Sequence, residues 1–129
     1  MTGSLFDSAE RLLTDLLHGG SQTITTPLKV ALVTVAGSDA TPGTEVTGGS
    51  YARATVTMGA AATSSGTTTS ANTAQVSIQV PAGTVVGWEI WDSSGTPKPL
   101  YYDYGITPRT YAAGDFAIFP IGNITYSQG

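Results

Sequence analysis

The segment from Val85 to Gly105 constrains the fold more than any other part of the chain. It carries both tryptophans and three of the six tyrosines, in two apolar, aromatic stretches that flank the turn-forming residues 92–97. This pattern predicts a β-hairpin, in which Gly95 is free to take a positive φ and Pro97 ends the loop.

The strands of such a hairpin have two different faces. Alternation places Trp88 and Ile90 on one face and Glu89 and Trp91 on the other. Ordering about 20 residues costs on the order of 30 kcal/mol, whereas burying one tryptophan returns roughly 5 kcal/mol. The hairpin therefore needs a second layer of the same chain to pack against.

Residues 4–18 have the pattern of an amphipathic helix. Ser4 is the expected N-cap, with Asp7 three residues later as a variant of the capping box, and Gly19–Gly20 is the expected end. A helix with so broad an apolar face must bury it, either on its own sheet or on a neighbouring subunit. The apolar positions at helical spacing are Leu5, Phe6, Ala9, Leu12, Leu13, Leu16 and Leu17.

The remaining segments predict strands separated by turn formers. Leu28–Ala36 changes the phase of its alternation, which indicates a bulge or burial on both faces. Ala74–Val80 alternates cleanly, with Val76, Ile78 and Val80 facing inward. The stretch Gly59–Thr73 is rich in Thr, Ser and Ala and is either a mobile loop or a Thr-rich edge strand. Further strands are expected at Tyr51–Met58, Asp115–Ile121 and Asn123–Tyr126, and residues 108–114 are expected to be a connector between the hairpin and Asp115–Ile121.

Together these elements predict a mainly β protein of about seven strands and one N-terminal helix. The expected fold is an antiparallel β-sandwich or a flattened barrel. We expect a single domain, in which residues 1–20 form a helix packed on the sheet or on a partner and residues 21–129 form the sandwich.

The composition is unusually poor in charge. Only 11% of the residues are charged, against about 25% in ordinary soluble domains. The chain has five Lys and Arg and nine Asp and Glu, and the net charge of −4 argues against a nucleic-acid-binding protein.

No apolar run approaches the ~20 residues that span a membrane, and the absence of cysteine excludes disulfides and thiolate chemistry. We infer that copies of the chain or other partners cover much of the surface; the alternative is a neutral, Thr-rich surface that is simply soluble.

The sequence offers little catalytic chemistry. His18, the single histidine, has no local nucleophile or orienting acid and is interpreted as a cation at the helix end. Glu89 and Asp92 flank Trp91 in the manner of a glycosidase pair, but two surface groups on a hairpin explain them more simply. We therefore predict no enzyme activity, no catalytic residue, no cofactor and no metal site.

Four aromatic residues of the hairpin are the main candidates for binding. Exposed rings could stack on sugars, whereas buried rings would belong to the core or to a subunit contact, which is the interpretation we prefer. These residues are Trp91, Tyr101, Tyr102 and Tyr104.

Several segments in order resemble one known family. They are the helix end Leu16–Gly20, the strand Leu28–Thr34, the block Gly43–Arg53, the hairpin sequence GWEIWDSSG and the late pair Gly114–Asp115. Nearly the whole chain resembles small virion proteins of tailed bacteriophages, usually labelled tail-fibre-like or minor tail proteins. Thr47 and Ser50 replace other small residues of the family pattern, and Gly59–Thr73 is unusually Thr-rich.

The resemblance implies a non-enzymatic structural protein that is made in the host cytoplasm and assembled on the virion, on the tail or as a capsid decoration or cement protein. The implied partners are copies of itself and other virion proteins, such as major capsid or tail proteins, with neither nucleic acid nor membrane. The alternative is a receptor- or glycan-binding module that uses exposed Trp and Tyr on host-surface glycans. The candidate folding or assembly residues are Leu12, Leu16, Tyr51, Arg53, Trp88, Trp91, Tyr102 and Tyr104.

Overall fold

The computed structural model describes residues 2–129, which form one helix and many short strands. Along the chain the elements are β1 (Thr2–Leu5), α1 (Asp7–Leu17), β2 (Leu28–Val35), β3 (Thr44–Glu45), β4 (Ala54–Val56), β5 (Ala62–Ser64), β6 (Thr67–Ala71), β7 (Val76–Gln79), β8 (Gly83–Val85), β9 (Gly87–Trp91), β10 (Pro99–Asp103), β11 (Arg109–Tyr111), β12 (Phe116–Phe119) and β13 (Thr125–Gln128). Within residues 2–129, no helix is long and apolar enough to cross a membrane.

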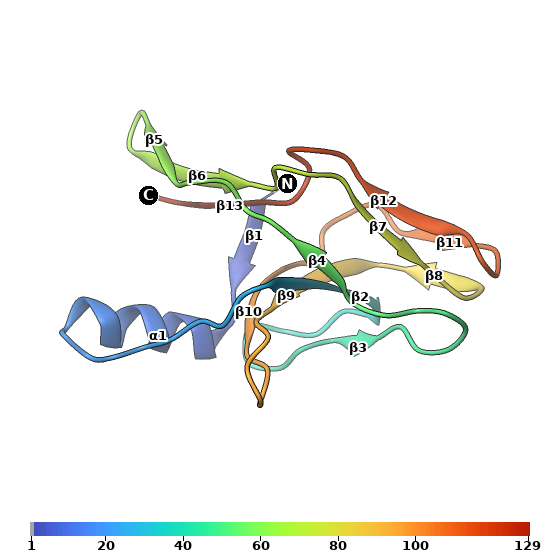
Figure 1. Cartoon of the computed structure of the whole chain (residues 1–129), viewed down its shortest axis with the longest axis horizontal. Coiled ribbons are helices and arrows are strands. Elements are labelled where there is room, and N and C mark those ends of the chain that lie inside the picture. The colour runs from blue at the N-terminus through green and yellow to red at the C-terminus, as the bar shows by residue number, and fades with distance from the viewer. Residues whose placement is uncertain (1) are drawn as a thin grey trace.

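The predicted hairpin lies at the centre of a large mixed sheet. Strand β9 pairs antiparallel with β10 on one side and with β2 on the other. The sheet runs in the order β3-β2-β9-β10-β1-β13-β6-β5, and β4 pairs with β2 off this path (Figure 1). Trp88 and Ile90 are 2% and 0% exposed on the core side, so the predicted alternation of the hairpin is confirmed.

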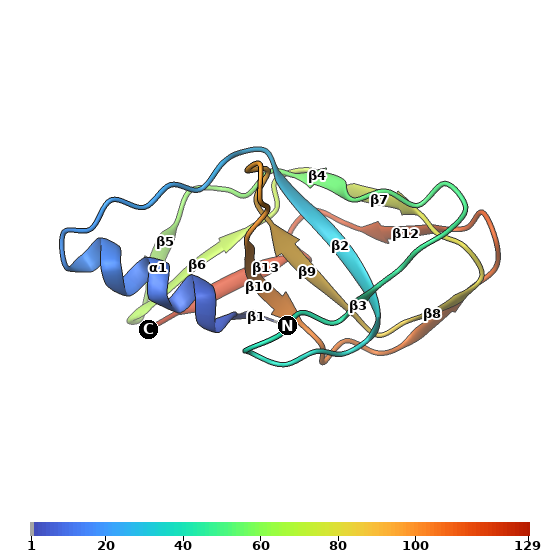
Figure 2. The ribbon, with the colours of Figure 1, turned by 90° about the horizontal axis from the view of Figure 1, so that it is seen from below.

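Two further strand pairs complete the second layer. Strand β7 pairs antiparallel with β12, and β8 pairs with β11. In Figure 1 the β7–β12 pair lies above β2 and β9, and Figure 2 shows it running beside β4. The core between the layers joins Val76 and Ile78 of β7 to Leu32 of β2 and Trp88 of β9. The sheets do not close into a barrel, and the mainly β sandwich is confirmed.

Strand β2 explains the change of phase in its sequence. Val30, Ala31, Leu32 and Val33 are each 0% exposed, because β2 is covered on both faces. The pairing of β2 with β3 also shifts register between Val33 and Val35. Both alternatives offered by the sequence, a bulge and two buried faces, are present.

The N-terminus differs from the prediction. Ser4 does not cap the helix, because residues 2–5 form strand β1, which pairs antiparallel with β10 and parallel with β13. Phe6 occupies the N-cap position and is 1% exposed, with its ring centroid 4.7 Å from that of Tyr102. Gly3 permits this close pairing, since a Cβ there would lie 2.8 Å from the Tyr101 ring. The predicted helix end is confirmed by the positive φ of 88° at Gly19.

The Thr-rich stretch forms an edge hairpin, not an unstructured loop. Strands β5 and β6 pair antiparallel, and their turn contains Ser65 and Gly66 with positive φ values of 51° and 83°. Thr63 and Thr68 contact each other through their hydroxyls at 2.7 Å across the two strands. Of the two predicted alternatives, the edge strand is the one that the structure shows.

Two further predicted details are wrong. Residues 2–129 contain thirteen strands where about seven were expected, because the additional ones are two to five residues long and too short for a clear alternation. Residues 108–114 are one example, since they contain β11. Gly95 does not take a positive φ; the loop is shaped by hydrogen bonds to Asp92.

Candidate functional site

A polar cluster on the outer face of the central sheet begins with Glu45, Tyr51 and Arg53. Arg53 donates to both carboxylate oxygens of Glu45, from Nη2 to Oε1 at 2.8 Å and from Nε to Oε2 at 3.0 Å. The Tyr51 hydroxyl donates to Glu45 Oε2 at 2.7 Å and accepts the backbone N–H of Leu32 at 3.0 Å. These bonds fasten residues 45–53 to the buried strand β2.

Arg53 connects this group to the hairpin. Its guanidinium carbon lies 4.3 Å from the ring centroid of Trp91, which is a cation–π contact. The indole N–H of Trp91 donates to Glu89 Oε1 at 3.1 Å. Glu89 Oε2 accepts the backbone N–H of Gly43 at 2.7 Å and also the hydroxyl of Tyr104. Glu89 is 1% exposed, and its carboxyl group accepts all three of these hydrogen bonds with Arg53 nearby.

The electrostatics of the cluster follow from burial and hydrogen bonding. Burial alone raises the pKa of Glu45, but hydrogen bonds from Arg53 and Tyr51 outweigh it, and the pKa lies below its ordinary value. Burial, with the hydrogen bond to Glu45, raises the pKa of Tyr51. Burial likewise raises the pKa of Tyr104, and its hydrogen bond to Glu89 adds to this. Glu45 is therefore ionised, and the phenols of Tyr51 and Tyr104 are neutral, at pH 7.

This arrangement holds a loop and leaves no reactive group poised for chemistry. Its polar groups bond to one another or to backbone, as expected of a structural network. Gly43 is needed at the centre, because a Cβ there would lie 2.3 Å from the carbonyl oxygen of Val35. Within residues 2–129, no group of three or more His, Cys, Asp or Glu residues is placed to hold a metal ion.

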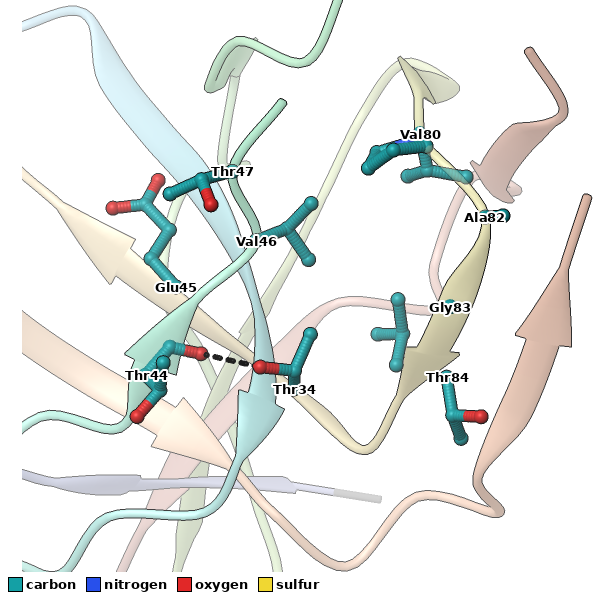
Figure 3. Close-up of a pocket in the computed structure, with 11 residues that line it drawn as sticks. Thr34, Thr44, Glu45, Val46, Thr47, Val80, Ala82, Gly83 and Thr84 are labelled. Atoms are coloured by element: carbon teal, nitrogen blue, oxygen red, sulfur yellow. Dashed lines mark hydrogen bonds between the residues drawn. The ribbon is translucent and has the colours of Figure 1, made fainter. Parts of the chain in front are cut away.

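A small cavity lies next to this cluster, between β3 and β8. It has a volume of about 160 Å³ and is lined by segments 44–47 and 80–85 together with Thr34. Figure 3 shows the hydroxyl of Thr34 donating to the carbonyl of Thr44, at 3.4 Å. Glu45 is the one charged residue in this lining, and its carboxylate points away from β8 (Figure 3). The cavity thus offers threonine hydroxyls and small apolar groups, and no catalytic pair.

A second candidate is the apolar groove between α1 and the sheet. It has a volume of about 230 Å³. Leu16 and Leu17 are 54% and 83% exposed, and of the residues of α1 only Ala9 is buried. The lining residues are Leu5, Ala9, Leu12, Leu13, Leu16, Gln22, Ile24, Leu100, Tyr101 and Tyr126.

The candidate residues from the sequence fall into three places. Leu12 and Leu16 line the apolar groove, and Tyr51, Arg53, Trp91 and Tyr104 belong to the polar cluster. Trp88 lies in the core, and its ring meets that of Tyr101 edge-on at 6.1 Å. Tyr102 stacks on Tyr104 with their centroids 4.4 Å apart.

The residues considered for catalysis are not brought together. His18 is exposed, and its Nδ1 contacts the carbonyl of Thr14 at 2.8 Å. Glu89 faces the polar cluster, whereas Asp92 accepts hydrogen bonds within its own hairpin loop. Both are 1% exposed, so their interpretation as surface groups is wrong. Sequence reasoning missed Glu89 as a buried acceptor. The available signal was an acid inside an aromatic strand at the centre of the sheet, where an unpaired charge could not stay buried.

One family comparison covers almost the whole chain. A family model described as "Podophage GP4 fiber I protein gp80" matches residues 5–127. No curated protein and no solved structure matches the chain. The match includes the complete polar cluster, α1 and the apolar groove. The chain therefore belongs to the podophage GP4 fiber I protein gp80 family and is a structural component of a bacteriophage virion.

Proposed function

We propose that the protein is a non-enzymatic fibre or tail subunit that assembles on the particle through the apolar face of α1. The observation that carries this proposal is the exposure of Leu16 and Leu17, at 54% and 83%, at the end of a helix anchored by Phe6. Burying a leucine fully is worth about 2 kcal/mol, so a helix that leaves two leucines in water favours a partner.

The polar cluster supports a scaffolding role. It holds residues 37–53 against the sheet through Glu45, Arg53 and Glu89, and none of these groups is free to act on a substrate. Membership of a fibre family gives other virion proteins as partners. We propose in addition that copies of the chain associate with one another, since 11% charged residues leave few charges to keep like surfaces apart.

The chain is proposed to fold as one unit, although α1 projects from the sandwich. Strand β1 lies between β10 and β13 in the large sheet, so residues 2–5 are part of the same sheet as the C-terminus. A single cooperative unfolding transition, identical by tryptophan fluorescence and far-UV circular dichroism, is the expected outcome. Two separated transitions would contradict it.

The experiment for assembly compares two variants of α1. Leu16→Gln with Leu17→Gln removes apolar surface without changing charge, and Thr14→Gln is the matched control, because Thr14 lines a surface groove beside the charged residues of α1. We expect the wild type and T14Q to associate with increasing concentration in sedimentation velocity, and the double variant to stay monomeric. Equal behaviour of all three chains would overturn the role of α1.

Placement on the particle needs a separate measurement. Gold-labelled antibody on intact particles should mark the tail or its fibres if the tail assignment is correct. Gold over the head, with an abundant band in a gel of purified particles, would instead establish a capsid decoration or cement protein.

The glycan-binding alternative stays a prediction. One face of Trp91 is covered by Arg53, and Tyr104 is bonded to Glu89 and stacked on Tyr102. These contacts favour the structural role for the aromatic set. Binding of the folded protein to a glycan array, lost in Trp91→Ala, would reverse this preference.

A further inference from the structure

Asp103 is a buried acid at one end of the sandwich. It follows Tyr101 on the core-facing side of β10, pairs with Trp88 in the ladder and is 4% exposed. Its Oδ1 accepts the backbone N–H of Gly105 at 2.8 Å, which closes an Asx turn. Its Oδ2 is buried and has no hydrogen-bond partner among residues 2–129.

Asp103 is also one of the residues that line an open groove. This groove has a volume of about 470 Å³ and lies between the end of β10, the end of β12 and the loop before β13. Its apolar walls include Ile106, Ile118 and Phe119, and Ile118 is 51% exposed. Thr107 and Asn123 add polar groups to the lining.

The charge of Asp103 has no counterpart in this groove. No Lys or Arg is among its lining residues in the part of the chain that is described. Arg53 and Lys98 are paired with Glu45 and Asp92, and Arg109 lies over the ring of Tyr111. Burying an acid without a cation or a full set of donors is costly, so this carboxyl group favours a positive donor from outside the described residues.

We propose that the groove beside Asp103 holds a lysine or arginine side chain of a neighbouring virion protein. The methylene stem of such a side chain packs on Ile106, Ile118 and Phe119, and its charged end donates to the carboxylate of Asp103. This inference rests on the proposed structural function and names the chemistry of one contact. It involves a different surface from the face of α1.

Other occupants fit the groove less well. A calcium ion takes about six to eight oxygen ligands, whereas Asp103 is the one carboxylate in the lining. A neutral sugar would satisfy the hydrogen bond but leave the buried charge uncompensated. A long basic side chain meets both the apolar walls and the charge.

The test uses small probes on the isolated, isotope-labelled chain. N-acetyl-lysine methylamide and N-acetyl-arginine methylamide are titrated while the amide resonances of Gly105 and Ile118 are followed by NMR. N-acetyl-norleucine methylamide has a similar stem without the charge and serves as the control probe. We expect saturable shifts with the basic probes and an affinity for norleucine lower by about tenfold or more.

Two matched variants separate binding from folding. Asp103→Asn keeps an oxygen for the Gly105 N–H, so the turn survives while the charge is lost; it should weaken binding of the basic probes by about tenfold or more. Asp39→Asn removes the same charge from an exposed loop and should change nothing. Equal binding of norleucine, unchanged binding by D103N, or no saturable shift would overturn the proposal.

Shifts at Gly105 caused instead by calcium chloride or by glucose would overturn it in favour of a metal or sugar site. Binding of the basic probes should also be independent of assembly through α1. The Leu16→Gln, Leu17→Gln variant should bind the basic probes as the wild type does. Loss of association with retained probe binding would therefore separate the two surfaces.

Discussion

The guanidinium of Arg53 lies over the indole ring of Trp91, with its central carbon 4.3 Å from the ring centroid. The same guanidinium forms a two-point contact with Glu45, whose side chain is 28% exposed, as is that of Arg53. Arg53 therefore joins the segment after β3 to the central hairpin. Both contacts depend on a flat, forked cation, which lysine cannot provide.

The first prediction concerns this dual contact. Arg53→Ala should lower the free energy of unfolding by about 1–2 kcal/mol, because the pair is partly exposed and screened. Arg53→Lys should recover less than half of this loss, since lysine keeps the charge but loses the two-point hydrogen bonding to Glu45 and the stacking on Trp91. Urea unfolding followed by tryptophan fluorescence measures both. Arg109→Lys, an exposed site over Tyr111, is the control and should have little effect; an R53K variant as stable as the wild type would contradict the argument.

The second prediction concerns the hydroxyl of Tyr51. Tyr51→Phe removes the acceptor for the backbone N–H of Leu32, a residue that is 0% exposed, and the donor to Glu45. The expected cost is about 1–2 kcal/mol, because a buried donor is left unpaired. Amide hydrogen exchange should also become faster at Leu32 in the variant. Tyr111→Phe on strand β11 controls for loss of a phenol, and unchanged exchange at Leu32 would refute the assignment.

The third prediction concerns the hairpin loop and pH. Burial alone raises the pKa of Asp92, but donors from the Lys98 backbone at 2.7 Å, the Ser94 hydroxyl at 2.8 Å and the Thr25 backbone at 3.2 Å lower it from 3.8 to about 2. Because the folded pKa is below the unfolded one, the ionised acid stabilises the fold above pH 4. This stabilisation is lost as the pH falls from about 4 to about 2, and it corresponds to about 2 kcal/mol.

Asp92→Asn isolates this contribution. The asparagine amide has an N–H₂ donor in place of one carboxylate oxygen, which accepted hydrogen bonds in the wild type. We therefore expect the variant to be less stable than the wild type at pH 7 by about 2 kcal/mol or more. The difference between the two chains should shrink between pH 4 and pH 2, as measured by urea titrations at fixed pH. Asp39→Asn should leave the whole pH profile unchanged. A constant difference between wild type and D92N down to pH 2 would show that ionisation of Asp92 is not the cause.

The parts of the fold that could be predicted depend on local patterns. Val76, Ile78 and Val80 alternate with polar residues, and turn formers separate the two strands of the hairpin, so β7, β9 and β10 leave a clear signal. Strand β1 leaves none. Its four residues continue into a helical pattern, and they are extended only because distant strands β10 and β13 pair with them.

The candidate site was only partly visible in the sequence for a similar reason. Tyr51 and Arg53 stand close to Glu45 along the chain, so a role in holding the glycine-rich segment could be expected. Glu89 and Gly43 are 46 positions apart in the sequence, and they meet only after β9 has paired with β2. Alternation placed Glu89 on the correct face, but it could not show that a loop covers that face and buries the acid.

The last prediction tests the close approach between the two hairpin strands at Gly87. A Cβ at this position would lie 2.6 Å from the carbonyl oxygen of Asp103 and 2.8 Å from Cδ1 of Tyr104. Gly87→Ala should therefore push β10 away from β9 and destabilise the fold by about 1–3 kcal/mol, with part of the strain reaching the bond between Tyr104 and Glu89.

Gly95→Ala is the matched substitution in the same hairpin. No atom lies within 4 Å of a Cβ at Gly95, and its φ is not positive, so alanine should be neutral or stabilising by up to about 1 kcal/mol. Thermal and urea unfolding of G87A and G95A side by side give the comparison. A G87A variant as stable as G95A would contradict this argument. It would show that β9 and β10 can move apart at no cost, so their close contact would not be what positions Glu89 and Asp103 on opposite faces of the sheet.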